Sequence, residues 1–323
     1  MTVLLTGGAG FIGSHLVDHL LTKTDHHLHV LDNFSTGSES NLDHIQSDRL
    51  ELVDGDVRDA NLVAEHVASA DSVYHLAAAV GVERIVDNPL DSLRTNLEGT
   101  ENVLSAAAAD ATPTFIASSS EVYGKSDSVP FGEDDNLVYG PTTSPRWGYA
   151  TAKAVDEFLA LSYHDEHDLP VVLGRYFNIV GPRQTGQYGM VIPTFVEQAL
   201  ADEPITVYGD GTQTRSFTHV ADTVAITHDL LETPAAHGEV FNIGAPGPTS
   251  INELAERIID QTNSDSTITH IPFAEAYDAD FEEPDQREPD VTKLRDTLGR
   301  APTANLDRIL RDVIGERSHE VYP

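Results

Sequence analysis

One segment limits the possible folds of this chain more than any other, the glycine-rich run at residues 6–13 (TGGAGFIG). It lies between a short apolar run at residues 2–6 and a helical pattern at residues 12–22. Glycines at positions 7, 10 and 13 allow a tight turn, a close approach of the backbone to a pyrophosphate and close packing of helix on strand. The N–H groups at the start of that helix would then face the phosphates.

Apolar runs alternate with helical patterns through the first half of the chain. We expect strands at residues 2–6, 28–32, 50–54, 72–76, 114–118 and 171–176, and helices at residues 12–22, 62–68, 95–109 and 149–164. This alternation is typical of parallel β-α-β units. The predicted fold class is therefore α/β, a doubly wound parallel sheet of the Rossmann type.

The alternation weakens from about Gly181, where Pro and Gly interrupt the chain more often. Residues 239–243 (EVFNI) nevertheless look like a strand that returns to the main sheet. We therefore expect a Rossmann domain of residues 1–178 and about 220–245, with a smaller, interleaved substrate domain of residues 179–219 and 246–323. Residues 281–289 (FEEPDQREP) are polar and bounded by Pro, which predicts an exposed loop.

Composition excludes several classes of function. The 323 residues contain 53 Asp and Glu against 19 Lys and Arg, a net charge of −34, which argues against a nucleic-acid partner. The absence of Cys excludes disulfides, thiolate nucleophiles and Cys-ligated metals. Only four basic residues are Lys, and such an acidic, Lys-poor surface resembles that of proteins from salt-loving organisms. No secretory signal precedes residues 2–6 and no apolar run could span a bilayer, so we expect a cytoplasmic protein without a membrane partner.

Asp32 ends the second predicted strand, 19 residues after Gly13. A carboxylate at this position suits two ribose hydroxyls and repels a 2′-phosphate. Asn33 and Phe34 follow without an adjacent Arg, so the cofactor is predicted to be NAD rather than NADP. Asp56 and Val57 follow the third strand and would lie at the adenine edge.

Tyr149 and Lys153 are four residues apart on a predicted helix and project from one face. A neighbouring ammonium favours the phenolate, so we expect Lys153 to lower the pKa of Tyr149. Such a phenolate can take a proton from a sugar hydroxyl while hydride leaves for NAD. Ser119 and Glu121 follow the fifth strand, at the edge of the sheet where an α/β site is expected. His75, at the end of the fourth strand, is predicted to be structural.

The sequence resembles the extended short-chain dehydrogenase/reductase family, namely its NAD-dependent nucleotide-sugar epimerases, dehydratases and decarboxylases. The matching segments run through most of the chain: TGGAGFIGSHL (6–16), LDNFSTG (31–37), GDVRD (55–59), HLAA (75–78), TNLEGTENVL (95–104), SSSEVYG (118–124), YATAK (149–153), RYFNIVGPR (175–183), VYGDGTQTRSFTHVAD (207–222) and FNIG (241–244).

The resemblance implies a role for each matching residue. Tyr149 would be the base, assisted by Lys153 and Ser119, with Glu121 as a further catalytic group. The implied NAD-binding residues are Gly7, Gly10, Phe11, Ile12, Gly13, Asp32, Asn33, Asp56, Val57, Ala77, Asn96 and Lys153. The implied ligands of the nucleotide diphosphate are Asn178, Arg183, Val207, Tyr208 and Arg215. The alternative for each Arg is a surface ion pair. The resemblance also implies a homodimer that pairs the helices at residues 95–109 and 149–164.

Several reactions fit these motifs. Residues 120–124 (SEVYG) and 145–149 (PRWGY) resemble UDP-glucuronate decarboxylases, in which Glu121 would manage the enolate proton. A 4-epimerase acting on UDP-glucose, UDP-galactose or a UDP-uronate is the alternative. A dTDP-glucose 4,6-dehydratase is disfavoured, because Ser120 stands where that enzyme carries Asp. A non-catalytic NAD-binding regulator would be expected to lack Tyr149 or Lys153.

Two further features of the sequence concern packing and metal binding. Trp147 fits packing as well as substrate binding. No metal is expected, because His164 and His167 stand without further clustered ligands.

Overall fold

The computed structural model describes residues 1–80, 88–186, 190–272, 275, 286–303 and 305–321. Its centre is a seven-stranded sheet with the strand order β3-β2-β1-β4-β5-β6-β11, and every neighbouring pair is parallel. The strands are β1 (Thr2–Thr6), β2 (His27–Asp32), β3 (Leu50–Asp54), β4 (Ser72–His75), β5 (Thr114–Ser119), β6 (Val171–Tyr176) and β11 (Glu239–Ile243). The fold class predicted from the sequence is confirmed.

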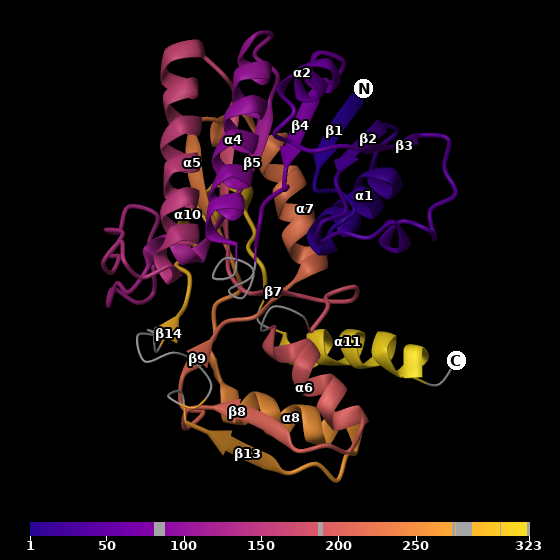
Figure 1. Cartoon of the computed structure of the whole chain (residues 1–323), viewed down its shortest axis with the longest axis vertical. Helices are drawn as coiled ribbons and strands as arrows, with labels where there is room; N and C mark the ends of the chain where they lie inside the picture. The colour runs from indigo at the N-terminus through magenta and orange to yellow at the C-terminus, as the bar shows by residue number, and fades with distance from the viewer. Residues whose placement is uncertain (81–87, 187–189, 273–274, 276–285, 304, 322–323) are drawn as a thin grey trace.

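Helices cover both faces of this sheet (Figure 1). On one face, α1 (Phe11–Lys23) and α7 (Val220–Leu231) pack against Val3 and Leu5. On the other, α2 (Ala60–Ala68), α4 (Pro89–Ala108) and α5 (Arg146–His167) pack around Leu4. Successive residues of β1 thus serve opposite layers, as the alternation of side chains along a strand requires.

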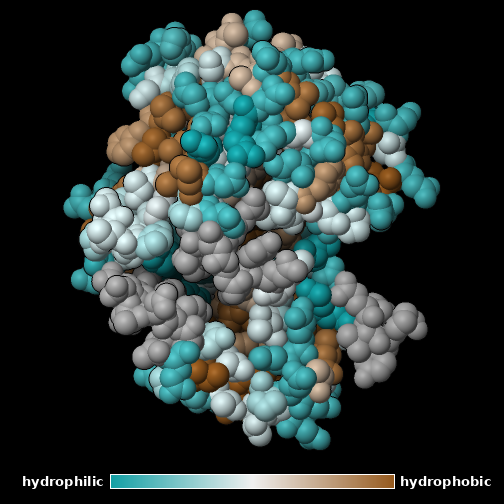
Figure 2. Space-filling view, viewed as in Figure 1, coloured by the Kyte–Doolittle hydropathy of each residue, from teal (hydrophilic) through white to brown (hydrophobic). Residues whose placement is uncertain are grey.

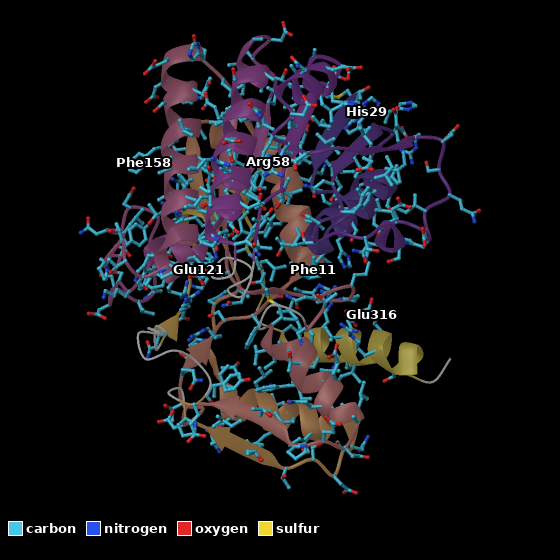
Figure 3. The ribbon with its side chains drawn as sticks, in the orientation of Figure 1. Phe11, His29, Arg58, Glu121, Phe158 and Glu316 are labelled. Atoms are coloured by element: carbon cyan, nitrogen blue, oxygen red, sulfur yellow. The ribbon has the colours of Figure 1, made fainter. Side chains whose placement is uncertain are left out.

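The strand order reverses between β1 and β4, and at such a switch point the carboxyl ends of the strands leave a crevice. Phe11, at the start of α1, and Glu121, in the short 3-10 helix η2 (Ser120–Tyr123) after β5, both lie at this edge (Figure 3). A second, smaller body lies beyond it (Figure 1).

The smaller body has its own apolar core, which includes Phe195, Leu254 and Leu310. Its elements are α6 (Val191–Leu200), β8 (Ile205–Tyr208), α8 (Ile251–Thr262), β13 (Ile268–Ile271) and α11 (Leu306–Val321). Two small sheets join the bodies: β7 (Ile179–Val180) with β10 (Thr218–His219), and β9 (Thr214–Arg215) between β12 (Thr249–Ser250) and β14 (Gln286–Arg287). The remaining elements are η1 (Glu39–Asn41), η4 (Pro234–Ala236) and α10 (Thr292–Leu298).

The C-terminal third departs from the expected pattern in two places. Val291 and Leu294 pack into the core shared by α1 and α7, although the predicted division put all of residues 246–323 in the smaller domain. The prediction of an exposed loop at residues 281–289 is wrong at Arg287 and Pro289, although Gln286 is exposed. Residues 281–285 lie outside the described residues, but Arg287 and Pro289 are buried, because β14 pairs with β9 and Arg287 finds a buried carboxylate. No described helix is both long and apolar enough to cross a membrane.

Candidate active site

The glycine loop between β1 and α1 has the shape that a dinucleotide requires. Gly7 has φ +72°, and a Cβ there would lie 2.6 Å from the Ala77 nitrogen. A Cβ on Gly13 would lie 2.2 Å from the carbonyl oxygen of Gly7. Gly10 is the N-cap of α1 and provides no side-chain cap, so the N–H groups in the first turn, including those of Phe11 and Ile12, suit phosphate oxygens. The loop therefore fits a pyrophosphate.

Asp32 closes the end of β2 beside this loop. Its Oδ2 accepts a hydrogen bond from the Ala9 nitrogen, and its Oδ1 accepts one from the Phe34 nitrogen, both at 2.9 Å. Burial raises the pKa of the carboxyl, while these two bonds lower it. The backbone bonds fix the orientation of the carboxylate, and each oxygen keeps a lone pair for a ribose hydroxyl.

Asp56 lies at the neighbouring strand end and is held by other side chains. Its carboxylate accepts two bonds from the Arg58 guanidinium, at 2.6 and 2.9 Å, and one from Asn33 Nδ2 at 3.0 Å. The bonds from Arg58 lower the pKa of Asp56 to about 2. Val57 is buried in the core against Gly99. At the predicted adenine edge, Asn33 and Asp56 thus form a polar surface held by hydrogen bonds, and the apolar side chain of Val57 is buried.

Buried polar side chains brace the segment after β4. Asn96 on α4 accepts from the Ala79 nitrogen at 2.7 Å, which fixes the backbone two residues beyond Ala77. His75 Nδ1 lies 2.7 Å from the Thr6 hydroxyl, and burial lowers the pKa of His75 to about 3. A neutral, fully bonded imidazole agrees with the structural role expected for His75.

Tyr149, Ser119 and Glu121 come together at the carboxyl edge of the sheet. The Ser119 hydroxyl lies beside the Tyr149 side chain and accepts a hydrogen bond from the Glu121 nitrogen at 3.2 Å. Burial raises the pKa of Tyr149, the charge of Glu121 raises it further, and the bond from Ser119 lowers it less. The expectation that Lys153 holds the pKa of Tyr149 below its usual value is wrong for this structure. The Lys153 ammonium lies 3.2 Å from Asp156 Oδ2, and its charge is offset there.

Glu121 lies between two arginines. Arg146 Nη1 donates to Glu121 Oε2 at 2.7 Å, and Arg287 Nη1 donates to Glu121 Oε1. Burial opposes ionisation, but the charges of Arg287 and Arg146 outweigh it and put the pKa of Glu121 at about 2. The carboxyl is therefore ionised at neutral pH, so it cannot donate a proton until these arginines change partners.

Arg215 brings a third buried guanidinium to the same region. Its Cα pairs with that of Arg287 on the neighbouring strand, and both side chains are largely buried. Two arginines thus bind one ionised carboxylate, and a third lies on the strand next to Arg287, in a chain whose net charge is −34. Guanidinium groups are suited to bind carboxylates and phosphates.

The other predicted substrate residues divide into two groups. Tyr208 is exposed at the end of β8, and Asn178 donates from Nδ2 to the Ser216 carbonyl at 2.9 Å, which ties β6 to the strand that carries Arg215. Val207 is fully buried in the core of the smaller body, so its side chain cannot touch a ligand.

Arg183 is bound elsewhere. Its Nη2 lies 2.7 Å from Asp18 Oδ2 and 2.8 Å from His15 Nδ1, both on α1, and its Nη1 donates to the Asn41 carbonyl. Its backbone nitrogen donates to Glu316 of α11 at 2.7 Å. The structure thus gives the ion-pair alternative for this residue, and Arg183 fastens the smaller body to α1 instead of facing a diphosphate.

Three further side chains serve packing. Trp147 is buried against Gly140, where a Cβ would meet its indole at 2.2 Å, and the Arg146 guanidinium lies 5.4 Å from its ring centroid. His164 Nδ1 lies 2.8 Å from the Leu169 carbonyl oxygen, and His167 packs on Tyr163. No group of three or more His, Cys, Asp or Glu side chains in the described part of the chain is arranged to hold a metal.

The model of the NAD dependent epimerase/dehydratase family matches residues 3–244. The chain belongs to this family. It is an enzyme that uses NAD, and its sheet and glycine loop are those of the family fold. It is 41% identical to the UDP-N-acetyl-alpha-D-glucosaminuronate decarboxylase of Bacillus cytotoxicus over 96% of both chains. It is 36% identical to UDP-glucuronic acid decarboxylase 2 of Arabidopsis thaliana, over all of this chain and 69% of that one.

Solved structures agree with the sequence matches. The UDP-glucuronic acid 4-epimerase of Bacillus cereus, in complex with UDP-glucuronic acid and NAD, superposes with a TM-score of 0.87. The two sequences are 30% identical, and the match covers 99% of this chain and 100% of that one. This similarity extends through the smaller body, so the family fold includes the region that carries Arg215 and Arg287.

Three residues of this epimerase/dehydratase site were not predicted: Arg146, Asp156 and Arg287. Arg146 had a usable signal, because it lies three residues before Tyr149 and so shares its helix face. Asp156 had the same signal relative to Lys153. Arg287 had none, since its partner Glu121 is 166 residues away.

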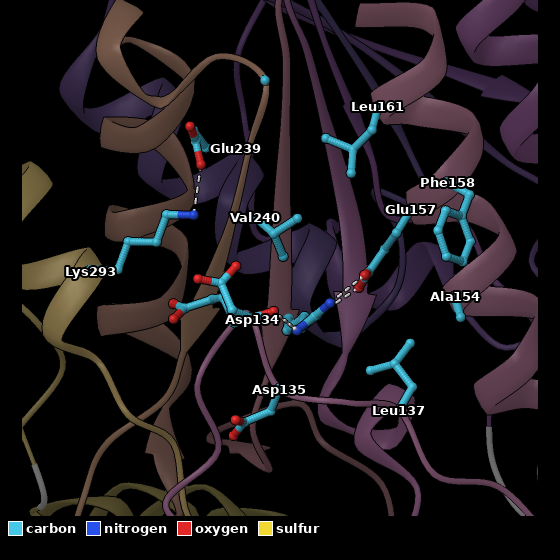
Figure 4. A pocket seen from close by; sticks show the side chains of 13 residues that line it. Asp134, Asp135, Leu137, Ala154, Glu157, Phe158, Leu161, Glu239, Val240 and Lys293 are labelled. Carbon is cyan, nitrogen blue, oxygen red and sulfur yellow. Dashed lines mark hydrogen bonds and ion pairs between the residues drawn. The ribbon is translucent and has the colours of Figure 1, made fainter. Parts of the chain in front are cut away.

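A separate cavity of about 350 Å³ lies between α5 and the β6–β11 edge of the sheet (Figure 4). Glu157 and Arg175 form an ion pair there, with Arg175 Nη2 2.7 Å from Glu157 Oε2, and Lys293 pairs with Glu239 at its rim. None of the predicted site residues lines this cavity.

Proposed function

We propose that this enzyme decarboxylates a UDP-linked hexuronate, such as UDP-glucuronate or its 2-acetamido analogue, through transient oxidation at sugar C4. The observation that carries the proposal is the Arg146–Glu121–Arg287 cluster beside Tyr149. A site that holds an ionised carboxylate between two arginines is also suited to recognise the carboxylate of a uronate. The two decarboxylases named above support the same substrate class.

When bound, NAD accepts hydride from C4 and later returns it. Tyr149, as phenolate, takes the proton of the C4 hydroxyl and gives it back in the final reduction. Ser119 shares that proton through its hydrogen bond to Tyr149. Lys153, one helical turn further along α5, would hold the nicotinamide ribose.

The C4 ketone makes the C5 carboxylate a β-keto acid. Its C5–carboxyl bond then breaks, CO2 leaves, and the electron pair passes into the C4–C5 enolate. Arg146 and Arg287 stabilise that negative charge, and C5 takes a proton before reduction. We infer that the uronate carboxylate draws an arginine away from Glu121, so that Glu121 takes up a proton from solvent and passes it to C5.

The remaining roles follow from position. The proposed NAD site comprises the glycine loop, Asp32, the rim of Asn33 and Asp56, the segment at Ala77 with its brace Asn96, and Lys153. The proposed diphosphate site comprises Arg215, Arg287 and Tyr208, with Asn178 as support. Arg183 and the Val207 side chain are left out, because their contacts lie elsewhere.

A UDP-uronate 4-epimerase is the second candidate. It needs the same C4 oxidation and the same carboxylate recognition, followed by reduction from the other face of the sugar without loss of CO2. The Bacillus cereus 4-epimerase favours it. A 4,6-dehydratase lacks support, because Ser120 offers no acid for a C6 leaving group, and a non-catalytic regulator does not need both Tyr149 and Lys153 in place.

Incubation of the enzyme with UDP-glucuronate, UDP-N-acetylglucosaminuronate, UDP-galactose and dTDP-glucose separates these functions. We expect a UDP-pentose and CO2 from one of the two uronates, measured by NMR and by CO2 release. Conversion of UDP-glucuronate to UDP-galacturonate without CO2 would replace the proposal by the 4-epimerase.

We also propose that the chain forms a homodimer through α4 and α5. Apolar side chains gather on this face, where Figure 2 shows brown atoms. Phe158 is 69% exposed and Val155 is exposed beside it on α5, while Leu90 is exposed on α4. Exposed apolar clusters on helices mark contact surfaces. Light scattering should find a dimer for the wild type and a monomer for Phe158→Asp, and a monomeric wild type rules the proposal out.

A further inference from the structure

Asp156 is a buried carboxylate that the reaction described above does not use. It lies on α5 three residues after Lys153, and neither side chain is exposed to solvent to any appreciable degree. The Lys153 ammonium lies 3.2 Å from Asp156 Oδ2. Burying a charge is costly unless it is paired, so this contact offsets part of the cost of burying both side chains.

The elements packed around this pair contribute few other charges. Thr100 of α4 bonds to the Asp156 carboxyl and lies 3.2 Å from His75 Nε2, and His75 bonds in turn to Thr6 at the start of the glycine loop. His75 is neutral, because burial and the charge of Lys153 both lower its pKa. Burial raises the pKa of Asp156, and Lys153 and Thr100 lower it less.

The charges of both carboxylates of the site affect the pKa of Tyr149. Glu121 of η2 and Asp156 of α5 each raise its pKa, and Ser119 of β5 lowers it. Glu121 is already balanced by Arg146 and Arg287. Asp156 instead takes up charge from Lys153, the cation expected to favour the phenolate.

We propose that Asp156 is a positioning residue that acts through Lys153: its ion pair orients the ammonium toward the nicotinamide ribose site and withholds part of that charge from Tyr149. Asp156 touches neither substrate nor reacting atoms. The inference rests on the proposed role of Tyr149 as base. It adds a residue that influences the pH at which Tyr149 ionises.

The test is the ionisation of Tyr149 itself, measured without substrate or added NAD. Protein containing 3-fluorotyrosine, whose phenol is more acidic than that of tyrosine, is titrated by 19F NMR, and the Tyr149 signal is assigned by its loss in Tyr149→Phe. In Asp156→Asn the midpoint should fall by roughly half a pH unit or more, because a nearby negative charge is removed. Asp156→Ser should shift it in the same direction and serves if the Asn variant does not fold.

Glu157→Gln is the matched control. Glu157 follows Asp156 on α5, is also buried and also forms an ion pair, but with Arg175 on the side of the cavity in Figure 4. Its loss should lower the melting temperature without moving the Tyr149 midpoint. In a Lys153→Met background, Asp156→Asn should shift the midpoint less, since only the direct repulsion between Asp156 and the Tyr149 phenolate is then removed.

An unchanged or raised midpoint in both Asp156 variants would overturn the inference, as would an equal shift in Glu157→Gln. With an active substrate, the acid limb of kcat should move to lower pH in Asp156→Asn. The two proposals fail separately: a wild type that turns over none of the nucleotide sugars overturns the proposed function, whereas the 19F titration judges Asp156 alone.

Discussion

Tyr149 lies beside Ser119 and Glu121, and removal of its hydroxyl oxygen tests its role. Tyr149→Phe keeps the ring and its packing but removes the proton acceptor, so turnover should fall by roughly 10²–10⁴-fold. NAD bound per protein, measured after denaturation, should stay the same. Tyr163→Phe on the same helix, which loses a bond to Glu101 far from the site, is the control. Unchanged turnover in Tyr149→Phe would remove Tyr149 from the reaction.

Glu121 makes a prediction about pH. Its pKa is about 2 in the folded protein against an ordinary value of 4.5, so the carboxylate stabilises the fold above about pH 4.5 and loses this effect as the pH falls through about 2. The full effect is on the order of 3 kcal/mol. The free energy of unfolding of Glu121→Gln should therefore be lower than that of the wild type at pH 6, and the gap should narrow toward pH 2. A gap that stays constant across this range would contradict the ion-pair account.

For single residues, the sequence predicts a contact well when a general rule of the fold brings the two partners together, and poorly when they are far apart in the sequence. Tyr149, Ser119 and Glu121 could be placed together because each follows or faces the carboxyl edge of a parallel sheet, a rule of the fold. The partners of Arg183 and Arg287 lie 165 and 166 residues away, on elements whose packing no local pattern reveals. Asp156 was overlooked although its spacing from Lys153 was visible, because a carboxylate within a helix usually faces solvent.

At the scale of elements, the close packing of the glycine loop against α1 leaves no room for a Cβ atom on Gly13. Gly13→Ala would put a Cβ 2.2 Å from the Gly7 carbonyl oxygen, which is backbone and cannot rotate away. We expect a loss of about 1–3 kcal/mol of stability and of most of the NAD that is retained on purification. Gly315→Ala in α11 meets nothing within 4 Å and should stabilise by about 0.5–1 kcal/mol. Wild-type NAD content in Gly13→Ala would contradict the proposed site.

The strands were easier to predict than the helix ends. β1, β3, β6 and β11 occupy the predicted residues. β1 and β6 are largely buried and form short apolar runs that stand out from their surroundings. β3, at the edge of the sheet, is mostly exposed. α4 begins at Pro89, six residues before the predicted start. Its first turns carry charged and exposed residues, which weaken the periodic pattern of apolar residues. Pro89 at the first helical position is the sequence signal that indicates the true start.

At the scale of the whole molecule, charge dominates. With 53 acidic and 19 basic residues, repulsion among carboxylates is spread over the surface, whereas exposed pairs such as Lys293–Glu239 each add little. Molar KCl screens both the repulsion and the pairs, and the repulsion is the stronger of the two effects. The melting temperature should therefore rise between 0.1 M and 2 M KCl, as measured by calorimetry. An unchanged or lower melting temperature would mean that the acidic surface is not an adaptation to salt.

Arg183 shows how the two bodies act as one molecule. Its guanidinium and backbone join α1, η1 and α11 at one point, so the smaller body that carries Arg215 is held against the body that carries the glycine loop. The crevice between them therefore has a defined geometry, which a reaction that returns hydride to the same carbon requires.

The central claim is that the sugar is oxidised at C4 and then reduced at the same carbon. A single turnover with UDP-glucuronate or UDP-N-acetylglucosaminuronate deuterated at C4, followed at 340 nm, tests it most directly. The account predicts a transient rise in absorbance that deuterium slows, a product that keeps deuterium at C4, and no transient in Tyr149→Phe. Product formed without a transient in absorbance and without an isotope effect on its rate would contradict the account.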